Sequence, residues 1–189
     1  MSFSIDALAT LAAGFDSARL RIAPVEADQA AAMLAWLLDP QVYTWISLTP
    51  PPDLATLQAR LGAWGTRCSL EERELQLAWS VQRRSDGAWI GALDANLSLS
   101  GVATNVGYFF GAPYWGQGLA TEAVAALCAH LDAHGITEQH ASVTVGNDAS
   151  CRVLERCGFR RIGLLPGNDT LRGELVDDWA FCRGGRQSG

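Results

Sequence analysis

A glycine-rich stretch in the second half of the chain has the make-up of an anion-binding loop. Residues 108–121 read YFFGAPYWGQGLAT, so an apolar run passes through Gly116 and Gly118 directly into a helical pattern. The first N–H groups of a helix have no intrahelical acceptor, and the helix dipole adds partial positive charge there. Glycines let an anion approach the backbone closely. The stretch therefore predicts a pyrophosphate site, the alternative being a plain strand-to-helix turn in which the glycines serve only tight packing.

The absence of lysine narrows the chemistry of this loop. The chain has fourteen arginines and no lysine. Lysine is required by Walker-type phosphate loops, by the phosphate-binding strand of kinases and by Schiff-base chemistry with pyridoxal phosphate. The chain therefore belongs to none of these three classes of protein. The dinucleotide fingerprint G-x-G-x-x-G/A also fails, because Gly116 and Gly118 are followed by Thr121.

A second motif follows the loop. Residues 147–159 read NDASCRVLERCGF. Together the two motifs resemble the GCN5-related N-acetyltransferase (GNAT) superfamily, and within it the branch of ribosomal-protein alanine and serine N-acetyltransferases. The family's loop pattern, Arg/Gln-x-x-Gly-x-Gly/Ala, is met by Gly118 and Ala120, with Trp115 in place of the usual Arg or Gln. The resemblance covers about residues 18–183. The later pattern is met by Asn147, Ala149, Ser150, Gly158 and Phe159.

The resemblance implies that acetyl-CoA is the co-substrate and that a primary amine attacks its thioester directly. The backbone of Tyr108, Phe109 and Phe110 would pair with the pantetheine amides. Asn147 would hydrogen-bond the pantetheine arm, cap the following helix, or do both. Arg152 is the candidate side-chain cation for the nucleotide's outer phosphate, whereas Arg156 is expected on a solvated face. The backbone amides expected to hold the pyrophosphate belong to Gly116, Gln117, Gly118, Leu119, Ala120 and Thr121.

The resemblance also points to Ser150 as the catalytic acid that protonates the departing thiolate. Many relatives use a tyrosine seven residues after the asparagine, but this chain has Leu154 there, which cannot donate a proton. The alternative for the Ser150 hydroxyl is to cap the first helical turn. A backbone N–H of the strand near 104–110 would stabilise the oxyanion. Relatives often carry a glutamate five residues before the asparagine, where Ser142 stands here, so the base stays open among Asp94, Glu122, His140 and Asp178.

The acceptor site is expected between the first two helices and the last pair of strands. Tyr43 and Trp45 are the predicted substrate-binding residues, because aromatic side chains suit a peptide end or an amphipathic amine. Aspartates near the last strands, such as Asp169 and Asp178, would attract a cationic amine. We expect a protein N-terminal amine as the acceptor. The alternatives are a small-molecule amine (antibiotic, polyamine or amino-acid-like metabolite) and a non-catalytic acyl-CoA-binding module.

Periodicity places these residues in one mixed α/β domain. Helical spacing predicts helices over about 26–38, 53–64, 119–134 and 149–157. The turn-rich segment 166–169 is expected to join the last two strands, and 43–49 is expected to be a loop. Alternation predicts strands over about 18–23, 75–82 and 140–145. Further strands are expected over about 89–98, 104–110, 160–165 and 175–182.

The resemblance implies a central, mostly antiparallel sheet with helices on both faces. The sheet should be splayed between the strands at 104–110 and 140–145. Residues 1–17 are expected to form an N-terminal extension, 18–183 the N-acetyltransferase domain and 184–189 a short tail.

Composition limits location and partners. The net charge of −6 argues against nucleic-acid binding. The start of the chain lacks the pattern of a signal peptide, and no apolar run is long enough for a membrane span, so we expect a cytoplasmic protein.

Five cysteines without a C-x-x-C pair indicate reduced thiols. His130 and His134 lack a third ligand in register, so we expect a solvated face and no metal. A monomer or a homodimer is expected.

Overall fold

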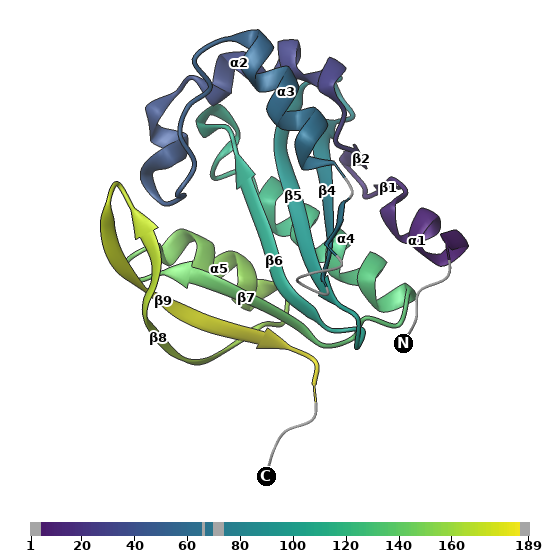
Figure 1. Ribbon diagram of the computed structural model, residues 1–189, viewed down its shortest axis with the longest axis vertical. Coiled ribbons are helices and arrows are strands. Elements are labelled where there is room, and N and C mark those ends of the chain that lie inside the picture. Colours follow the sequence, from purple (N-terminus) through teal and green to yellow (C-terminus); the bar gives the residue numbers. More distant parts are fainter. Residues whose placement is uncertain (1–4, 66, 70–73, 186–189) are drawn as a thin grey trace.

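The computed structural model describes residues 5–65, 67–69 and 74–185, and within them nine strands form one sheet (Figure 1). The strand order is β1-β2-β4-β5-β6-β7-β9-β8, with β3 paired to β4. All the pairings are antiparallel except that of β6 with β7. The sheet is therefore mostly antiparallel, as the resemblance implies. The strands are β1 (Phe15–Asp16), β2 (Leu20–Pro24), β3 (Arg67–Ser69), β4 (Glu74–Arg83), β5 (Trp89–Ser98), β6 (Ala103–Phe110), β7 (Gln139–Thr144), β8 (Arg160–Leu171) and β9 (Glu174–Arg183).

Helices cover both faces of this sheet because alternate strand residues point to opposite sides. On β4, Leu77 and Trp79 belong to a core cluster with residues of α1, α4 and α5, whereas Ala78 belongs to a cluster with α2 and α3. Asp53 caps α3, its carboxylate accepting from the N–H of Thr56 at 2.7 Å. The helices are α1 (Ile5–Ala12), η1 (Ala27–Gln29), α2 (Ala30–Leu37), η2 (Pro40–Thr44), α3 (Leu54–Trp64), η3 (Ala112–Tyr114), α4 (Leu119–Ala133) and α5 (Asp148–Arg156).

The sheet opens between β6 and β7, as expected. Ala103 and Gln139 form the aligned pair between the two strands in the described residues. Beyond this pair the strands diverge, and α5 lies behind the opening (Figure 1). The edge of β6 that faces β7, over 108–110, is therefore available to a ligand rather than to a neighbouring strand.

The N-terminal residues that the structure describes pack onto the sheet. β1 pairs with β2, and Leu11 of α1 is fully buried in the α4-side cluster. The indole N–H of Trp79 donates to the carbonyl oxygens of Ala12 and Ala13, at 3.2 and 3.1 Å. No helix in the described parts of the chain is long and apolar enough to cross a membrane.

The solvated face predicted for His130 and His134 is wrong for His130. Its ring stacks on Phe15 with centroids 4.3 Å apart, and its Nε2 lies 2.8 Å from the carbonyl oxygen of Leu11. Burial lowers the pKa of His130. The reason is that residues 5–16, whose structure the sequence pattern leaves undefined, cover this part of α4.

The last two strands differ most from their prediction. β8 continues through 166–169, the segment predicted as the turn, and the chain reverses at Arg172 and Gly173 instead. These two residues have φ values of 55° and 88°, as in a type I′ hairpin turn. The segment 166–169 contains a break in register, where the N–H of Gly167 donates to Asp177 at 2.8 Å. Pro, Gly and Asn suit a bulge as well as a turn, so composition alone does not separate the two.

Candidate active site

Two adjoining cavities lie where β6 and β7 separate. The hairpin cavity, of about 640 Å³, lies between the η2–α3 segment and the β8–β9 hairpin. The loop cavity, of about 440 Å³, runs along the glycine loop and α5. A group bound in one cavity therefore meets a group bound in the other at their common wall. The residues that line both are Trp45, Ile46, Tyr108, Phe109, Asn147 and Ser150.

The glycine loop has the backbone that an anion site needs. Gly116 and Gly118 have φ values of 72° and 73°, and Gly118 is the N-cap of α4. A Cβ at Gly116 would meet nothing within 4 Å, so the positive φ rather than tight packing favours glycine there. The first N–H groups of α4 have no intrahelical acceptor. Of the predicted cofactor residues, those that line the loop cavity are Tyr108, Phe109, Phe110, Gly116, Gly118, Leu119, Ala120, Thr121, Asn147 and Arg152.

Gln117 is the predicted cofactor residue that does not line this cavity. Its side-chain amide donates to the carbonyl oxygen of Pro113 at 2.9 Å, and its own carbonyl oxygen accepts from Arg19 at 3.1 Å. The loop therefore holds Gln117 by both its side chain and its backbone.

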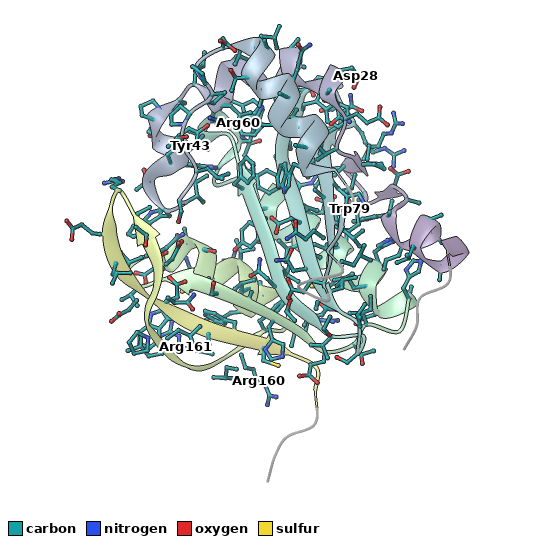
Figure 2. All side chains as sticks on the ribbon, viewed as in Figure 1. Asp28, Tyr43, Arg60, Trp79, Arg160 and Arg161 are labelled. Atoms are coloured by element: carbon teal, nitrogen blue, oxygen red, sulfur yellow. The ribbon has the colours of Figure 1, made fainter. Side chains whose placement is uncertain are left out.

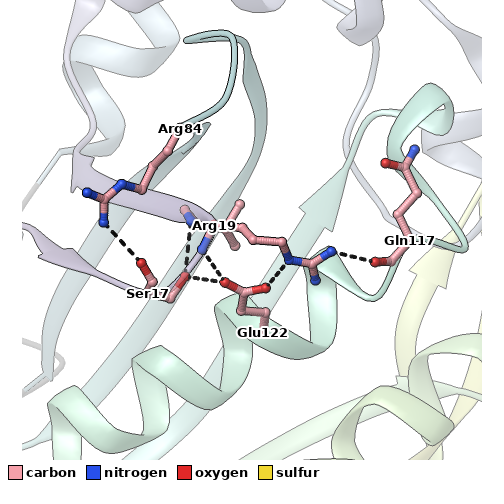
Figure 3. A network of polar contacts seen from close by, with 6 residues as sticks. Ser17, Arg19, Arg84, Gln117 and Glu122 are labelled. Carbon is pink, nitrogen blue, oxygen red and sulfur yellow. Dashed lines mark hydrogen bonds and ion pairs between the residues drawn. The ribbon is translucent and has the colours of Figure 1, made fainter.

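Glu122 fixes the loop from behind (Figure 3). Its carboxylate accepts from the Nε of Arg19 at 2.6 Å, from the N–H of Arg19 at 2.7 Å and from the hydroxyl of Ser17 at 2.7 Å. Burial acts to raise the pKa of Glu122, but these hydrogen bonds outweigh it and lower the pKa. Because Glu122 lines neither cavity, it is a positioning residue for the loop and not a candidate base.

The N-terminus of α5 brings Asn147 and Ser150 to the common wall. Asn147 caps the helix, its Oδ1 accepting from the N–H of Ser150 at 3.2 Å. The Ser150 hydroxyl lies 2.6 Å from that of Tyr108, which also donates to the Ser150 carbonyl oxygen at 3.1 Å. Burial raises the pKa of Tyr108 above its ordinary value. Sequence reasoning assigned Tyr108 a backbone role only, because no local signal shows that its hydroxyl reaches α5.

The remaining residues of α5 divide between core and cavity. Leu154 is fully buried in the α4-side cluster. Arg152 and Arg156 are both exposed, as expected for Arg156, and both also line the loop cavity. Two guanidinium groups are thus available to a phosphate at this end of the cavity.

Aromatic side chains of the η2–α3 segment line one side of the hairpin cavity. Tyr43 lines it, and its hydroxyl donates to the Leu37 carbonyl oxygen at 2.7 Å (Figure 2). Trp45 is 40% exposed and lines both cavities, and its ring lies against Gly146. Trp64 also lines the hairpin cavity.

Two contacts join the η2–α3 segment to the β8–β9 hairpin. The Ser47 hydroxyl donates to the Asp169 carboxylate, and Arg172 donates to the Thr44 carbonyl oxygen at 3.1 Å. Segments far apart in the sequence are therefore joined beside the hairpin cavity.

Carboxylates line the floor and the hairpin side of the hairpin cavity. Asp94 on β5 is partly buried, and burial raises its pKa to about 6. Asp178 on β9 is 3% exposed; its Oδ2 accepts from Asn168 at 2.8 Å, and its Oδ1 has no partner among the described residues. His140 pairs with Glu138 at 2.9 Å and lies in neither cavity. Of the four predicted base candidates, Asp94 and Asp178 thus face the cavity.

Comparison with known proteins gives matches to one group of enzymes. The family model described as the acetyltransferase (GNAT) domain matches residues 19–160. An uncharacterised N-acetyltransferase, p20, from Bacillus licheniformis is 25% identical over 165 residues, which are 86% of this chain and 91% of p20.

Solved structures share the fold. The microcin C7 self-immunity acetyltransferase MccE, in complex with acetyl-CoA and AMP, has a TM-score of 0.75 at 16% identity over 88% of this chain and 93% of its own. The ribosomal L7/L12 α-N-protein acetyltransferase RimL, in complex with coenzyme A, has a TM-score of 0.74 at 19% identity over 88% of this chain and 94% of its own.

Proposed function

Since this chain belongs to the GNAT family and is an acetyl-CoA-dependent acetyltransferase, we propose that its acceptor is the α-amino group of a protein N-terminus. The observation that carries the proposal is the hairpin cavity, lined by aromatic side chains and carboxylates, which meets the loop cavity at Tyr108, Phe109 and Ser150. An acetyl thioester extended along the loop cavity meets there an amine that enters through the hairpin cavity. This juxtaposition is what direct transfer between two substrates requires.

The loop cavity fits the parts of coenzyme A. The free edge of β6 at Tyr108, Phe109 and Phe110 pairs with the pantetheine amides, as an added strand would. The loop N–H groups and the start of α4 hold the pyrophosphate. Arg152 and Arg156 then supply the charge for an outer phosphate, in a chain without lysine.

Tyr108 and Ser150 supply the proton for the departing thiolate. When the Tyr108 hydroxyl directs its one proton to Ser150 Oγ rather than to the Ser150 carbonyl oxygen, the proton of Ser150 is free to face the sulfur. The phenol supports the serine as a donor, because hydrogen-bonded hydroxyls polarise one another in a low dielectric. A backbone N–H of β6 stabilises the oxyanion.

The hairpin cavity suits the end of a polypeptide. Its volume of about 640 Å³ lies in the usual range for ligand pockets, roughly 300–1,000 Å³. Its walls combine aromatic side chains with carboxylates, which match a short peptide segment that ends in an ammonium group. RimL, which shares the fold, is named as an enzyme of this kind.

A small-molecule amine is the second candidate, and a specific observation favours it. Three aspartates, Asp94, Asp169 and Asp178, line one cavity, and their summed charge suits a compound with several amino groups. MccE, which also shares the fold, is named as a self-immunity enzyme that was solved with AMP.

Release of the CoA thiol from acetyl-CoA separates these acceptors. The assay compares lysine-free hexapeptides that have free N-termini with the same peptides acetylated in advance, and with spermidine and an aminoglycoside. We expect turnover with the free peptides and none with the blocked ones. Turnover restricted to the polyamine or the antibiotic would overturn the N-terminal acceptor. Coenzyme A binding without turnover of any amine would indicate the non-catalytic module.

A further inference from the structure

We propose that Asp94 is the catalytic base that accepts the proton of the acceptor ammonium group. The inference rests on the acetyl transfer proposed above, but it holds for whichever amine the enzyme accepts. Asp94 lies on β5, and its carboxylate lines the hairpin cavity, through which the amine enters.

The sheet makes room for this carboxylate at one position. Asp94 and Gly107 are register partners on β5 and β6. A Cβ at position 107 would overlap both carboxylate oxygens of Asp94, so only a glycine leaves that space to the acid. The next residue is Tyr108, the first of the backbone groups proposed for the pantetheine arm. The carboxylate therefore lies beside the strand segment on which the thioester would rest.

In the part of the chain that the structure describes, no basic side chain forms an ion pair with Asp94. Within the described residues, neither an ion pair nor a hydrogen bond to its carboxylate is present, and burial is the cause that raises its pKa to about 6. A carboxylate that is partly removed from water and lacks a partner is best stabilised by a bound cation. The other charged or titratable groups on the same cavity are Tyr43, Arg60, Tyr108, Asp169 and Asp178.

Each of the other two acids at this cavity accepts at least one hydrogen bond. Asp169 accepts from the Ser47 hydroxyl and from the N–H of Thr170 at 2.7 Å. Asp178 accepts from Asn168 through Oδ2, and its Oδ1 has no partner among the described residues but is shielded from solvent, since the residue is 3% exposed. Their charges increase the attraction of the cavity for a cation, while Asp94 keeps free acceptor oxygens. A base whose pKa lies near 6 is ionised at neutral pH and is more basic than an ordinary aspartate.

In the proposed step, Asp94 takes one proton from the ammonium group before the nitrogen attacks. An N–H proton of the ammonium passes to an Asp94 oxygen, and the nitrogen lone pair that is freed forms the N–C bond to the acetyl carbonyl carbon. The carbonyl π pair moves onto oxygen and returns as the tetrahedral intermediate collapses. The C–S bond then breaks with its electron pair on sulfur, and Ser150 protonates the thiolate. The second N–H proton of the attacking nitrogen replaces the proton that Ser150 has given up, which leaves a neutral amide. Asp94 then returns its proton to solvent through the open cavity.

The test compares Asp94→Asn with Asp28→Asn, which removes an exposed charge on η1, away from both cavities (Figure 2). The acceptor is whichever amine the thiol-release panel identifies. For D94N, kcat should fall at least about 100-fold, as expected for loss of a general base, while the Kd for CoA stays within twofold. The wild-type kcat should decline below a pH near 6, and D94N should lose that inflection. D28N should match the wild type in all three.

A second variant guards against a change in folding. Gly107→Ala keeps the acid but displaces it, so its kcat should fall while its circular dichroism and its CoA affinity are retained. A D94N enzyme within threefold of wild-type kcat, or one that keeps the inflection near pH 6, would overturn the proposal. Failure of every peptide in the panel, with turnover of another amine, would overturn the N-terminal acceptor and leave this test in place. With no turnover of any amine, no base is needed and the proposal falls with the transfer itself.

Discussion

The hydroxyl groups of Tyr108 and Ser150 lie 2.6 Å apart, across the gap between β6 and α5. One residue belongs to the strand whose edge is open to the pantetheine arm, and the other to the helix capped by Asn147. The contact therefore joins the two motifs of the sequence at the place where both cavities meet.

Removing either hydroxyl should slow the chemical step. We expect Ser150→Ala to lower kcat about 100-fold and Tyr108→Phe about 10-fold, magnitudes within or just below the usual range for acid catalysis. The double variant should be no slower than S150A, because the two hydroxyls act as one unit. Steady-state kinetics at saturating acetyl-CoA would show this, with Ser98→Ala at the far end of β5 as the control. An S150A rate equal to that of the wild type would remove Ser150 from the mechanism.

Loosening the glycine loop should weaken binding of CoA and leave the chemistry intact. Glu122→Gln removes the ion pair with Arg19, which also holds the Gln117 carbonyl oxygen. We expect the Kd for CoA to rise about threefold to tenfold, since a single pair of this kind contributes about 1 kcal/mol. Isothermal titration measures this Kd. Asp86→Asn, which breaks the surface pair with Arg83, serves as the control, and a large fall in kcat for E122Q would contradict a purely positioning role.

Salt should weaken CoA binding through the arginines of α5. Arg152→Ala and Arg156→Ala should each raise the Kd and flatten its dependence on ionic strength, because exposed charges are screened by salt. Titrations at 50 and 500 mM salt would measure the slope. Arg160→Ala, an exposed position on β8 outside both cavities, should leave that slope unchanged. An unaltered slope for both α5 variants would place the outer phosphate elsewhere.

The pKa of Asp94 predicts a cost in stability at neutral pH. Its folded-state pKa of about 6 lies above 3.8, the ordinary value for an aspartate, so the folded state favours the protonated acid. The contribution of Asp94 to the free energy of unfolding is therefore fully present below pH 4 and is lost as the pH rises through 6. Asp94→Asn should increase the free energy of unfolding at pH 8 by on the order of 1–3 kcal/mol, with little difference at pH 4. Urea unfolding at both pH values tests this, and a D94N protein that is less stable at pH 8 would contradict it.

Much of the fold could be predicted from local pattern. Strand patterns located β4, β5, β6 and β7 to within a residue or two, and helical spacing located α3 and α5. These elements follow from side-chain period and backbone hydrogen bonding, which act over a few residues. The bulge in β8 and the cover over His130 could not be predicted, since each depends on a segment distant in sequence.

The sequence by itself determined the chemistry that is available: a glycine loop opening α4, the Asn147 motif, and a chain whose side-chain cations are arginines. Only the tertiary structure decided which groups meet. In it, the Tyr108 hydroxyl lies beside that of Ser150, and the Asp94 carboxylate occupies the space that the missing side chain of Gly107 leaves. Glu122 lies outside both cavities, where it binds Arg19. The physical reason is that the register and splay of the sheet set the distances between residues that are tens of positions apart in the sequence. Local propensity depends on a few neighbouring residues, so it cannot predict those distances.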